Sequence, residues 1–303
     1  MEQKNMENIA TLNFINKQTY SREDVLKFYE GANNLLRTEQ VLFEKLLPAI
    51  KDKKILDIGI GGGRTTAHLL EISNDYTGVD YVTEFVDKTA EKYPNARVLW
   101  ADATNLEQFA DETFDFILFS YNGLDSISND ARLKLMREAN RVLKADGVFM
   151  FSSHNRDYRY FNKLPWQQKF QFNKGFLIFF LHCLYHLPKH FKMKKHEIYT
   201  DDYAIINDGD HRFSLLLYYI SIRNQKKQLA EIGFENVEAY DMDGELVESD
   251  AESHWIHYLA RKNGEQTQLC EQSSVNVRSK KFFSATLLPA FTTFCELLSY
   301  HPV

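Results

Sequence analysis

The chain has 303 residues, of which 44% are hydrophobic and 26% are charged, with only 13 glycines and 6 prolines. This composition is that of a globular protein that can bury a core, and it excludes collagen-like, low-complexity and disordered chains. The formal net charge of −6 hides a basic segment over 156–196, whose own charge is +8. Such a segment suits an anionic substrate, a membrane surface or nucleic acid, although a solvated face is the plainer interpretation.

The cysteines and the N-terminus indicate the compartment. Cys183, Cys270 and Cys295 are odd in number, widely spaced and without a C-x-x-C pair, so we expect neither a disulfide framework nor a metal site. No apolar stretch of a secretory signal follows Met1, and the longest apolar run, 175–187, is shorter than the roughly 20 residues that cross a bilayer. We therefore expect a cytoplasmic protein that is soluble or peripheral to a membrane.

The first 60 residues predict two helices and a strand. Ser21 with Asp24 resembles a capping box and starts a helix over 23–30, and a second amphipathic pattern covers 37–50. A buried strand over 54–58 then runs directly into a glycine-rich loop.

From this loop onward, apolar strands alternate with helical patterns. This alternation predicts βαβ crossovers and a parallel sheet covered on both faces. Residues 156–217 interrupt this pattern, because they are rich in aromatic and basic residues and show no clear alternation of strands and helices. Strands are expected over 76–80, 96–101, 114–120 and 148–152, helices over 64–72, 84–92, 129–144 and 225–232, and an antiparallel strand pair over 236–240 and 254–261. Asn129 is the candidate cap of the helix over 129–144.

The chain is thus expected to contain one elaborated α/β core. Its predicted parts are N-terminal helices over 1–50, a ligand-binding core over 51–155, an inserted aromatic and basic cap over 156–217, the end of the core over 218–262, and a linker with an apolar tail over 263–303.

The glycine loop has the spacing G-x-G-x-G. Gly59, Gly61 and Gly63 let the backbone turn tightly and approach a ligand without a Cβ in the way. A nicotinamide-type loop would need glycine where Arg64 stands, and the Gly-Lys-Ser/Thr of a phosphate-binding loop is absent. The alternative is a plain turn from strand to helix.

Two acidic residues follow the next strands. Asp80 lies 17 residues after Gly63, where a carboxylate can accept hydrogen bonds from two ribose hydroxyls. Asp102 ends the third strand, where an acid can accept from an exocyclic adenine amine. Helix capping is the alternative for both residues.

Five motifs in order resemble class I S-adenosylmethionine-dependent methyltransferases, with high specificity over 50–155. The last strands resemble the end of that fold to about 262, and the insert and both termini lie outside the resemblance. The motifs are the run from Ile55 to Gly63, Gly78-Val79-Asp80, Ala101-Asp102-Ala103, Phe114-Asp115-Phe116-Ile117, and the run from Glu138 to Gly147.

The resemblance implies a doubly wound, Rossmann-like α/β fold. Its sheet would be mostly parallel and seven-stranded with an antiparallel last strand, and the inserted helical cap would be added to it. It also implies that S-adenosyl-L-methionine is the cofactor, with the methionine part on the glycine loop, the ribose on Asp80 and the adenine on Asp102 and the Ala103 backbone. The full set of implied cofactor residues is Asp57, Gly59, Gly61, Gly63, Asp80, Tyr81, Asp102, Ala103 and Ser120.

The resemblance also implies that the molecule that accepts the methyl group binds at the ends of the fourth and fifth strands. His154 is the candidate base there, because an imidazole titrates near neutral pH, although a purely structural histidine fits equally. Tyr121 is the second catalytic candidate, since an aromatic ring can cradle a methyl cation or a substrate ring, but core packing is its plainer role. The substrate candidates are Asn122, Asn155 and Tyr219.

Missing motifs narrow the acceptor. The segment after the fourth strand lacks the Asn/Asp-Pro-Pro-Tyr/Phe sequence of enzymes that methylate exocyclic amines of nucleic-acid bases. The Pro-Cys pair of enzymes that attack a cytosine carbon is also absent. A small molecule is therefore favoured over RNA, protein or an amphiphilic membrane-associated acceptor, and over a non-enzymatic binding role.

The insert is expected to cover the acceptor site. Its apolar run 175–187 is predicted to pack against the core and the acceptor, while its flanking lysines leave a membrane surface as the alternative.

Overall fold

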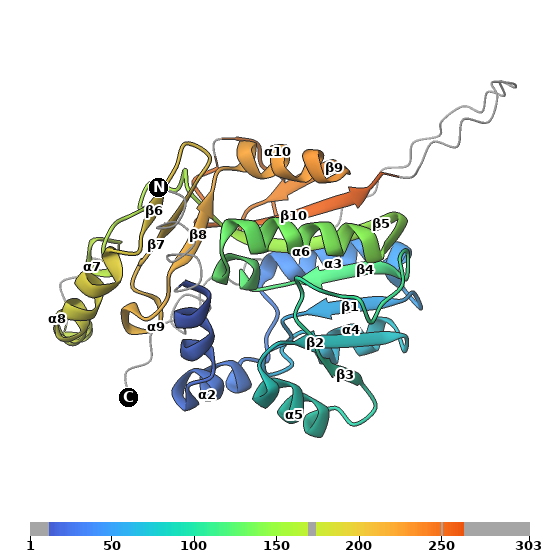
Figure 1. Cartoon of the computed structure of the whole chain (residues 1–303), viewed down its shortest axis with the longest axis horizontal. Coiled ribbons are helices and arrows are strands. Elements are labelled where there is room, and N and C mark those ends of the chain that lie inside the picture. The colour runs from blue at the N-terminus through green and yellow to red at the C-terminus, as the bar shows by residue number, and fades with distance from the viewer. Residues whose placement is uncertain (1–11, 169–173, 250, 264–303) are drawn as a thin grey trace, which may run out of the picture. The chain divides into compact units, whose positions relative to one another are not determined.

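We describe a computed structural model of the chain, in which residues 12–168, 174–249 and 251–263 are placed. The predicted linker and apolar tail beyond residue 263 lie outside the described residues, as does the stretch before residue 12. The described residues form one unit around a central twisted sheet, with helices on both faces (Figure 1).

Ten strands are present in the described part of the chain. They are β1 (Ile55–Ile58), β2 (Tyr76–Asp80), β3 (Arg97–Trp100), β4 (Phe114–Phe119), β5 (Leu143–Asn155), β6 (Ile198–Tyr199), β7 (Tyr203–Ile206), β8 (Leu217–Ile220), β9 (Phe234–Tyr240) and β10 (Trp255–Lys262).

The sheet contains the seven-strand arrangement expected from the sequence. Strands β3, β2, β1, β4 and β5 lie side by side and parallel, as the βαβ alternation predicts. The last strand, β10, pairs antiparallel with β5 and carries β9 on its other edge. The expected fold class is therefore confirmed.

Three further strands extend this core. Strand β8 pairs parallel with the end of β5, where Asn155 lies opposite Ile220, and β7 and β6 follow antiparallel. The insert thus contains helices, as expected, and also β6 and β7, which the sequence did not predict. They escape notice because β6 has two residues and β7 has four, too few to show a period.

The helices of the described residues include all those predicted over 23–30, 37–50, 64–72, 84–92, 129–144 and 225–232, with small shifts at their ends. They are a helix over 12–20, α2 (Glu23–Gly31), α3 (Arg37–Ile50), α4 (Thr66–Ile72), α5 (Thr83–Lys92), α6 (Asn129–Val142), α7 (Pro165–Gln168), α8 (Lys174–Lys194), α9 (Asp210–Phe213) and α10 (Ile222–Ile232), with the short 3-10 helix η1 (Gly123–Ser126).

Two predictions about helix ends are wrong. Ser21 does not cap α2, because its hydroxyl donates back to the Lys17 carbonyl of the helix over 12–20, a helix the sequence analysis missed. The cap of α6 is Ser128 rather than Asn129, since the Ser128 hydroxyl accepts from the Ala131 amide.

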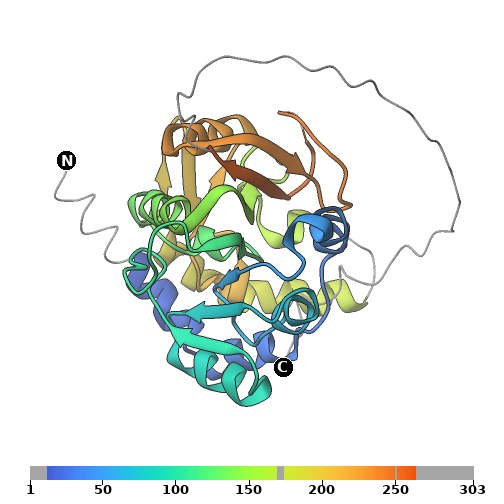
Figure 2. The same ribbon diagram turned by 90° about the vertical axis from the view of Figure 1, so that its right-hand side faces the viewer.

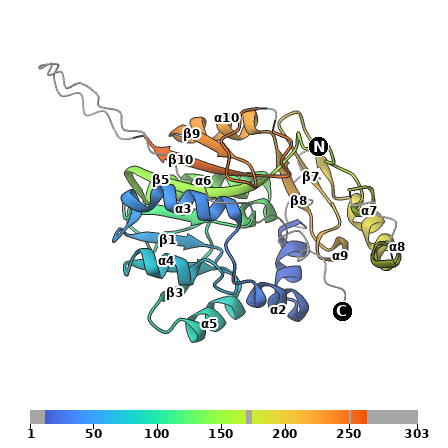
Figure 3. The same ribbon diagram turned by 180° about the vertical axis from the view of Figure 1, so that it is seen from behind.

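Apolar helix faces cover both sides of the sheet. Helices α3 and α4 pack on one face and α6 and α10 on the other, so that strand residues such as Ile55 and Phe149 are fully buried. The two helix layers are visible when the sheet is seen along its edge (Figure 2) and from behind (Figure 3). The carboxyl ends of the parallel strands face the helix over 12–20 and α2.

The apolar run of the insert does not pack as expected. It forms most of α8, which lies at the edge of the described unit next to α7 and α9 (Figure 1). Leu177, Leu181 and Tyr185 are more than half exposed, so the prediction that this segment is buried against the core is wrong. Only Cys183, among the residues of the run, is buried.

Candidate active site

A cavity of about 310 Å³ lies at the carboxyl ends of β1, β2, β3 and β4. Ligand sites of doubly wound sheets form at this edge, where the loops that follow the strands converge. The helix over 12–20 and α2 form the opposite wall through Lys17, Tyr20 and Tyr29. Of the predicted site residues, the cavity is lined by Gly59, Gly61, Asp80, Tyr81, Asp102, Ala103, Ser120 and Tyr121.

The loop after β1 requires glycine for two different reasons. Gly59 and Gly61 have φ of +67° and +50°, a region that side chains rarely adopt. A Cβ on Gly59 would also lie 2.5 Å from the Phe119 ring, and one on Gly62 would lie 2.6 Å from the α2 backbone at Glu30. The loop is therefore clamped between β4 and α2, with its backbone on the cavity.

Asp80 is the acidic group that faces this loop. Its Oδ2 accepts the Gly61 amide at 3.0 Å and its Oδ1 accepts the Val82 amide at 2.9 Å. The side chain is nearly buried, and burial raises its pKa to about 6 despite the two amide donors. Each carboxylate oxygen keeps a further lone pair that can accept a hydrogen bond from a ligand.

Two predicted cofactor residues lie behind the loop and do not line the cavity. The Asp57 Oδ2 accepts from the Thr65 hydroxyl at 2.7 Å and the Tyr76 hydroxyl at 3.1 Å, and burial raises its pKa to about 7. Gly63 has φ of +78°, and a Cβ on it would meet Thr89 of α5 and Tyr93, the residue that follows α5. Both residues hold the loop in shape from the side of α4 and α5.

The far end of the cavity combines one exposed acid with apolar groups. Asp102 and Ala103 follow β3, and the Asp102 carboxylate accepts the Thr104 amide at 2.8 Å. Trp100 donates its indole N–H to the Tyr81 carbonyl at 2.9 Å, which fixes the rim of this end. Apolar side chains of Ile127 and Leu135 complete the wall.

The fourth strand ends in a charged network that the sequence analysis missed. Arg64 donates to both oxygens of Glu39, at 2.6 Å each, and to the Ser120 hydroxyl at 2.5 Å. Its guanidinium also lies 5.0 Å from the centre of the Tyr121 ring. Glu39 is 1% exposed, yet its pKa is lowered, because Arg64 outweighs the burial that would raise it. This pair fixes Ser120 and Tyr121 at the cavity edge.

No sequence pattern marked Glu39 as part of this site. It belongs to α3, which precedes the glycine loop, and its partner Arg64 was noted only as the residue that interrupts G-x-G-x-x-G. One signal was present, since an acid at a core-facing position of an amphipathic helix needs a partner when it is buried.

His154 belongs to a buried polar cluster behind Tyr121, and it does not line the cavity. Its Nδ1 lies 2.8 Å from the Asp125 Oδ2, which also accepts the His154 amide at 2.6 Å. Its Nε2 lies 3.3 Å from the side-chain amide of Asn122. The other Asp125 oxygen accepts from Ser153 at 2.8 Å and from Arg132 at 3.3 Å.

This cluster sets the protonation of the imidazole. Burial alone would lower the pKa of His154, but the hydrogen bond and charge of Asp125 raise it above the ordinary value. The ring lies 4.8 Å from that of Tyr219 and 5.8 Å from that of Trp255, which in turn packs edge-on to Tyr121 at 5.0 Å. A chain of rings thus connects His154 with the cavity edge.

The remaining substrate candidates have structural partners. The Asn155 amide donates to the carbonyls of Ala251 and Ser253, at 2.8 and 2.9 Å, and ties the loop before β10 to β5. Tyr219 donates its hydroxyl to Asp208 at 2.6 Å. Neither residue lines the cavity, whereas Tyr20 and Tyr29 do, although the sequence analysis did not select them.

Comparisons with known proteins agree with this geometry. Residues 55–147 match the family described as "Methyltransferase domain". A probable S-adenosylmethionine-dependent methyltransferase of Mycobacterium tuberculosis is 27% identical over 138 residues, which span 46% of this chain and 49% of that protein. The chain therefore matches about half the length of this relative.

Two further comparisons extend over more of the chain. Glycine/sarcosine N-methyltransferase of Aphanothece halophytica is 24% identical over 270 residues, covering 80% of this chain and 91% of that protein. The solved structure of 1,6-didemethyltoxoflavin-N1-methyltransferase of Burkholderia thailandensis superimposes with a TM-score of 0.53 at 17% identity, covering 85% of this chain and 90% of that one. This likeness concerns the fold.

The family match begins at β1 and ends at Gly147, within β5. It includes the glycine loop, Asp80, Asp102 and the edge after β4 that form the cavity. On this evidence residues 55–147 are a methyltransferase domain, and the chain resembles class I S-adenosylmethionine-dependent methyltransferases.

Proposed function

We propose that this chain binds S-adenosylmethionine in the cavity and transfers its methyl group to a small-molecule acceptor. The observation that carries the proposal is the nearly buried Asp80 carboxylate on the cavity wall, held by amides of the glycine loop and of its own strand end. Because its pKa of about 6 lies below neutral pH, the carboxylate is ionised there and accepts strongly from hydroxyl donors.

The cofactor would be held along the cavity in three parts. Asp80 accepts from the ribose hydroxyls, and the backbone of Gly59 and Gly61 lies along the methionine part. Asp102 and the Ala103 backbone would pair with the adenine edge, while Ile127, which also lines the cavity, would contact its ring. In this proposal Asp57 and Gly63 act by shaping the loop, because their neighbours are Thr65, Tyr76 and α5.

When bound, S-adenosylmethionine supplies an electrophilic methyl group on a sulfonium. An acceptor aligned with that carbon would form the new bond with its lone pair as the carbon–sulfur bond breaks, and the electrons of that bond would return to sulfur. The protein mainly has to align the two groups and keep water out, effects worth about 7–11 kcal/mol together. Tyr121 fits this positioning role, because Arg64 and Trp255 pack on its ring at the cavity edge.

His154 is the proposed base for an acceptor that carries a proton. In the neutral form its Nδ1–H donates to Asp125 and its Nε2 accepts from Asn122, so Nε2 takes a proton only after the Asn122 N–H turns away. The Asn122 Oδ1 is buried without a hydrogen-bond partner. A half turn of that amide would let Oδ1 accept from protonated Nε2, so Asn122 suits both charge states.

A small acceptor is supported by the relative that covers most of the chain, whose name gives glycine and sarcosine as its acceptors. Tyr121, which lines the cavity and packs edge-on to Trp255, offers an aromatic ring to such a molecule.

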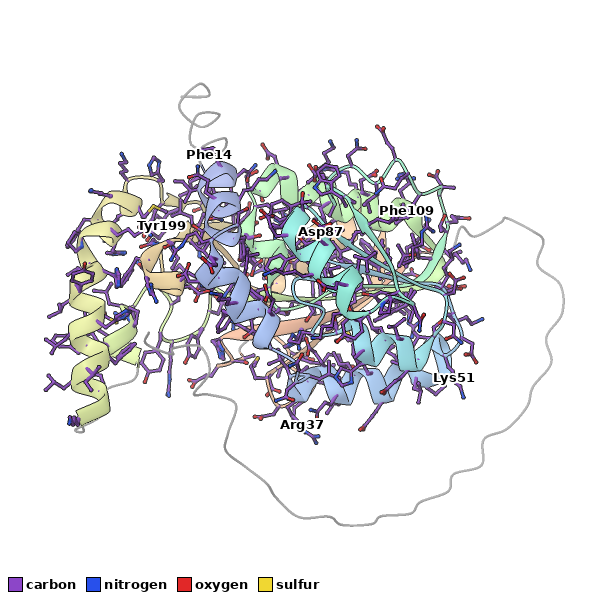
Figure 4. The ribbon with its side chains drawn as sticks, turned by 90° about the horizontal axis from the view of Figure 1, so that it is seen from below. Phe14, Arg37, Lys51, Asp87, Phe109 and Tyr199 are labelled. Atoms are coloured by element: carbon purple, nitrogen blue, oxygen red, sulfur yellow. The ribbon has the colours of Figure 1, made fainter. Side chains whose placement is uncertain are left out.

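The experiment is a transfer assay with S-adenosylmethionine labelled in its methyl group. The purified full chain is incubated with a cell extract, and the products are divided by ultrafiltration into small molecules and macromolecules. We expect label in the small-molecule fraction, and its loss in Asp80→Ala but not in the matched control Asp87→Ala. Asp87 is an exposed acid on the outer face of α5 (Figure 4).

Label retained on macromolecules would contradict the small-molecule part of the proposal. Equal transfer by Asp80→Ala and the unchanged chain would contradict the site. His154→Gln should slow single-turnover transfer by about 10²- to 10⁴-fold if it removes a base, and an unchanged rate would return His154 to a structural role.

A further inference from the structure

Helix α8 exposes a continuous apolar face, although it is part of the insert that was expected to be buried. Leu177, Leu181 and Tyr185 are 55%, 55% and 79% exposed, and Ile178 and Leu184 beside them are 49% and 39% exposed. Residues four apart share one side of a helix, so these five side chains form a single stripe. We call this stripe the α8 face, and side chains along α8 project outward at the edge of the molecule (Figure 4).

The other side of α8 is anchored, which fixes the direction of the α8 face. Cys183, His190 and Met193 are buried, and the His190 Nδ1 lies 2.8 Å from the Asn207 Oδ1. Met193 packs with apolar residues of β7 and β8, such as Ile205. The helix therefore cannot turn its apolar face inward without unpairing His190 and uncovering Met193.

Basic residues bracket the α8 face along the helix. Lys174 lies seven residues before Leu181, and Lys192 lies seven residues after Tyr185, so both fall on the same side of the helix as the apolar stripe. Both lysines are exposed, and α8 carries no aspartate or glutamate. The surface that fits the α8 face must therefore offer apolar contact with negative charge at both ends.

We propose that α8 docks in the plane of an anionic phospholipid surface. Acyl chains would receive Leu177, Leu181 and Tyr185, and acidic headgroups would pair with Lys174 and Lys192, whose long stems let the ammonium groups reach the headgroup level. This inference is independent of the proposed methyl transfer. No helix among the described residues is long and apolar enough to cross a membrane, and docking in the plane needs none.

Charge disfavours the other possible occupants. A second copy docked through the same face would place lysines against lysines, because such an interface repeats one patch. The remainder of this chain, 264–303, contains three acidic and three basic residues, so it offers no net negative charge to the α8 face. Anionic lipid supplies both the apolar and the negative part.

The test is sedimentation of the full chain with vesicles, without cofactor. We expect binding to phosphatidylcholine mixed with phosphatidylserine, little binding to phosphatidylcholine alone, and release by high salt. Leu181→Glu should weaken binding at least tenfold, and Lys174→Gln and Lys192→Gln about fivefold each. The matched control is Leu47→Glu, at an exposed leucine of α3, which should bind as the unchanged chain does.

Circular dichroism checks that each variant is folded, which is expected because the changed side chains are exposed. Equal vesicle binding by Leu181→Glu and the unchanged chain would overturn the proposal, as would salt-independent binding to phosphatidylcholine alone. Absence of vesicle binding would overturn it too. A dimer that Leu181→Glu converts to a monomer would then assign the α8 face to a second copy, and exchange protection of α8 in a monomer would assign it to this chain itself.

Discussion

The cavity edge of β1 to β4 and the insert over 156–217 belong to the same sheet, but they differ in how far the sequence predicts their contacts. At the cavity edge, residue types are set by the backbone around them: Gly59 has a positive φ, and Asp80 accepts hydrogen bonds from two backbone amides. In the insert, groups find partners far along the chain, as the Ser214 carbonyl does in the Thr19 hydroxyl 195 residues away, or face outward from α8. The comparison shows that a requirement of the backbone can be recognised in the sequence as a motif, whereas packing between distant segments cannot.

The largest expected effect lies behind the cavity edge, where β8 and α10 join the core. Asp125, in η1, accepts from both His154 and Arg132, and Arg132 also donates to Gln225 of α10 at 2.8 Å and lies 4.5 Å from the ring centre of Tyr218 in β8. Asp125→Ala would leave the fully buried Arg132 without its charged partner, so the free energy of unfolding should fall by about 3–5 kcal/mol.

Urea unfolding measures this loss, with Asp87→Ala as the control that should change stability by no more than about 0.5 kcal/mol. A loss below about 1 kcal/mol in Asp125→Ala would mean that β8 and α10 are attached to the core by other contacts.

The next effect tests the requirement of the backbone at the cavity edge. Gly59→Ala places a Cβ at φ +67° and 2.5 Å from the Phe119 ring, so it should cost about 2–4 kcal/mol of stability and distort the loop. Gly31→Ala is the matched control, because a Cβ there meets nothing within 4 Å. Thermal unfolding of the two variants gives the comparison, and equal melting temperatures would show that the loop does not need glycine at 59.

The smallest effect is a pH dependence of stability. The pKa of His154 is raised in the folded chain, so the protonated form stabilises the fold below the unfolded value of 6.5. That stability should disappear as the pH rises through the folded pKa, on the alkaline side of 6.5. His154→Gln should flatten this part of the profile, and urea unfolding at a series of pH values measures it. An unchanged profile would place the titration elsewhere.

The sequence predicted the parallel core, the antiparallel last strand and eight of the cavity-lining residues because these follow from period, loop chemistry and motif order. It could not predict Glu39, since nothing local shows that α3 directs an acid toward Arg64 across the glycine loop. The sequence analysis also missed the left-handed backbone at Tyr121 and Asn122, with φ of +57° and +55°, because neither residue is a glycine. The burial of α8 was misjudged because apolar content alone does not say which face finds a partner.

The central claim is that Asp80 holds the ribose of S-adenosylmethionine. Calorimetric titration of the full chain with S-adenosylhomocysteine, comparing Asp80→Ala with Asp87→Ala, tests it most directly. We predict that Asp80→Ala binds about 10- to 100-fold more weakly, because ribose hydroxyls lose a charged acceptor worth about 1.5–3 kcal/mol, while Asp87→Ala binds unchanged. Equal affinity of Asp80→Ala and the unchanged chain would contradict the account.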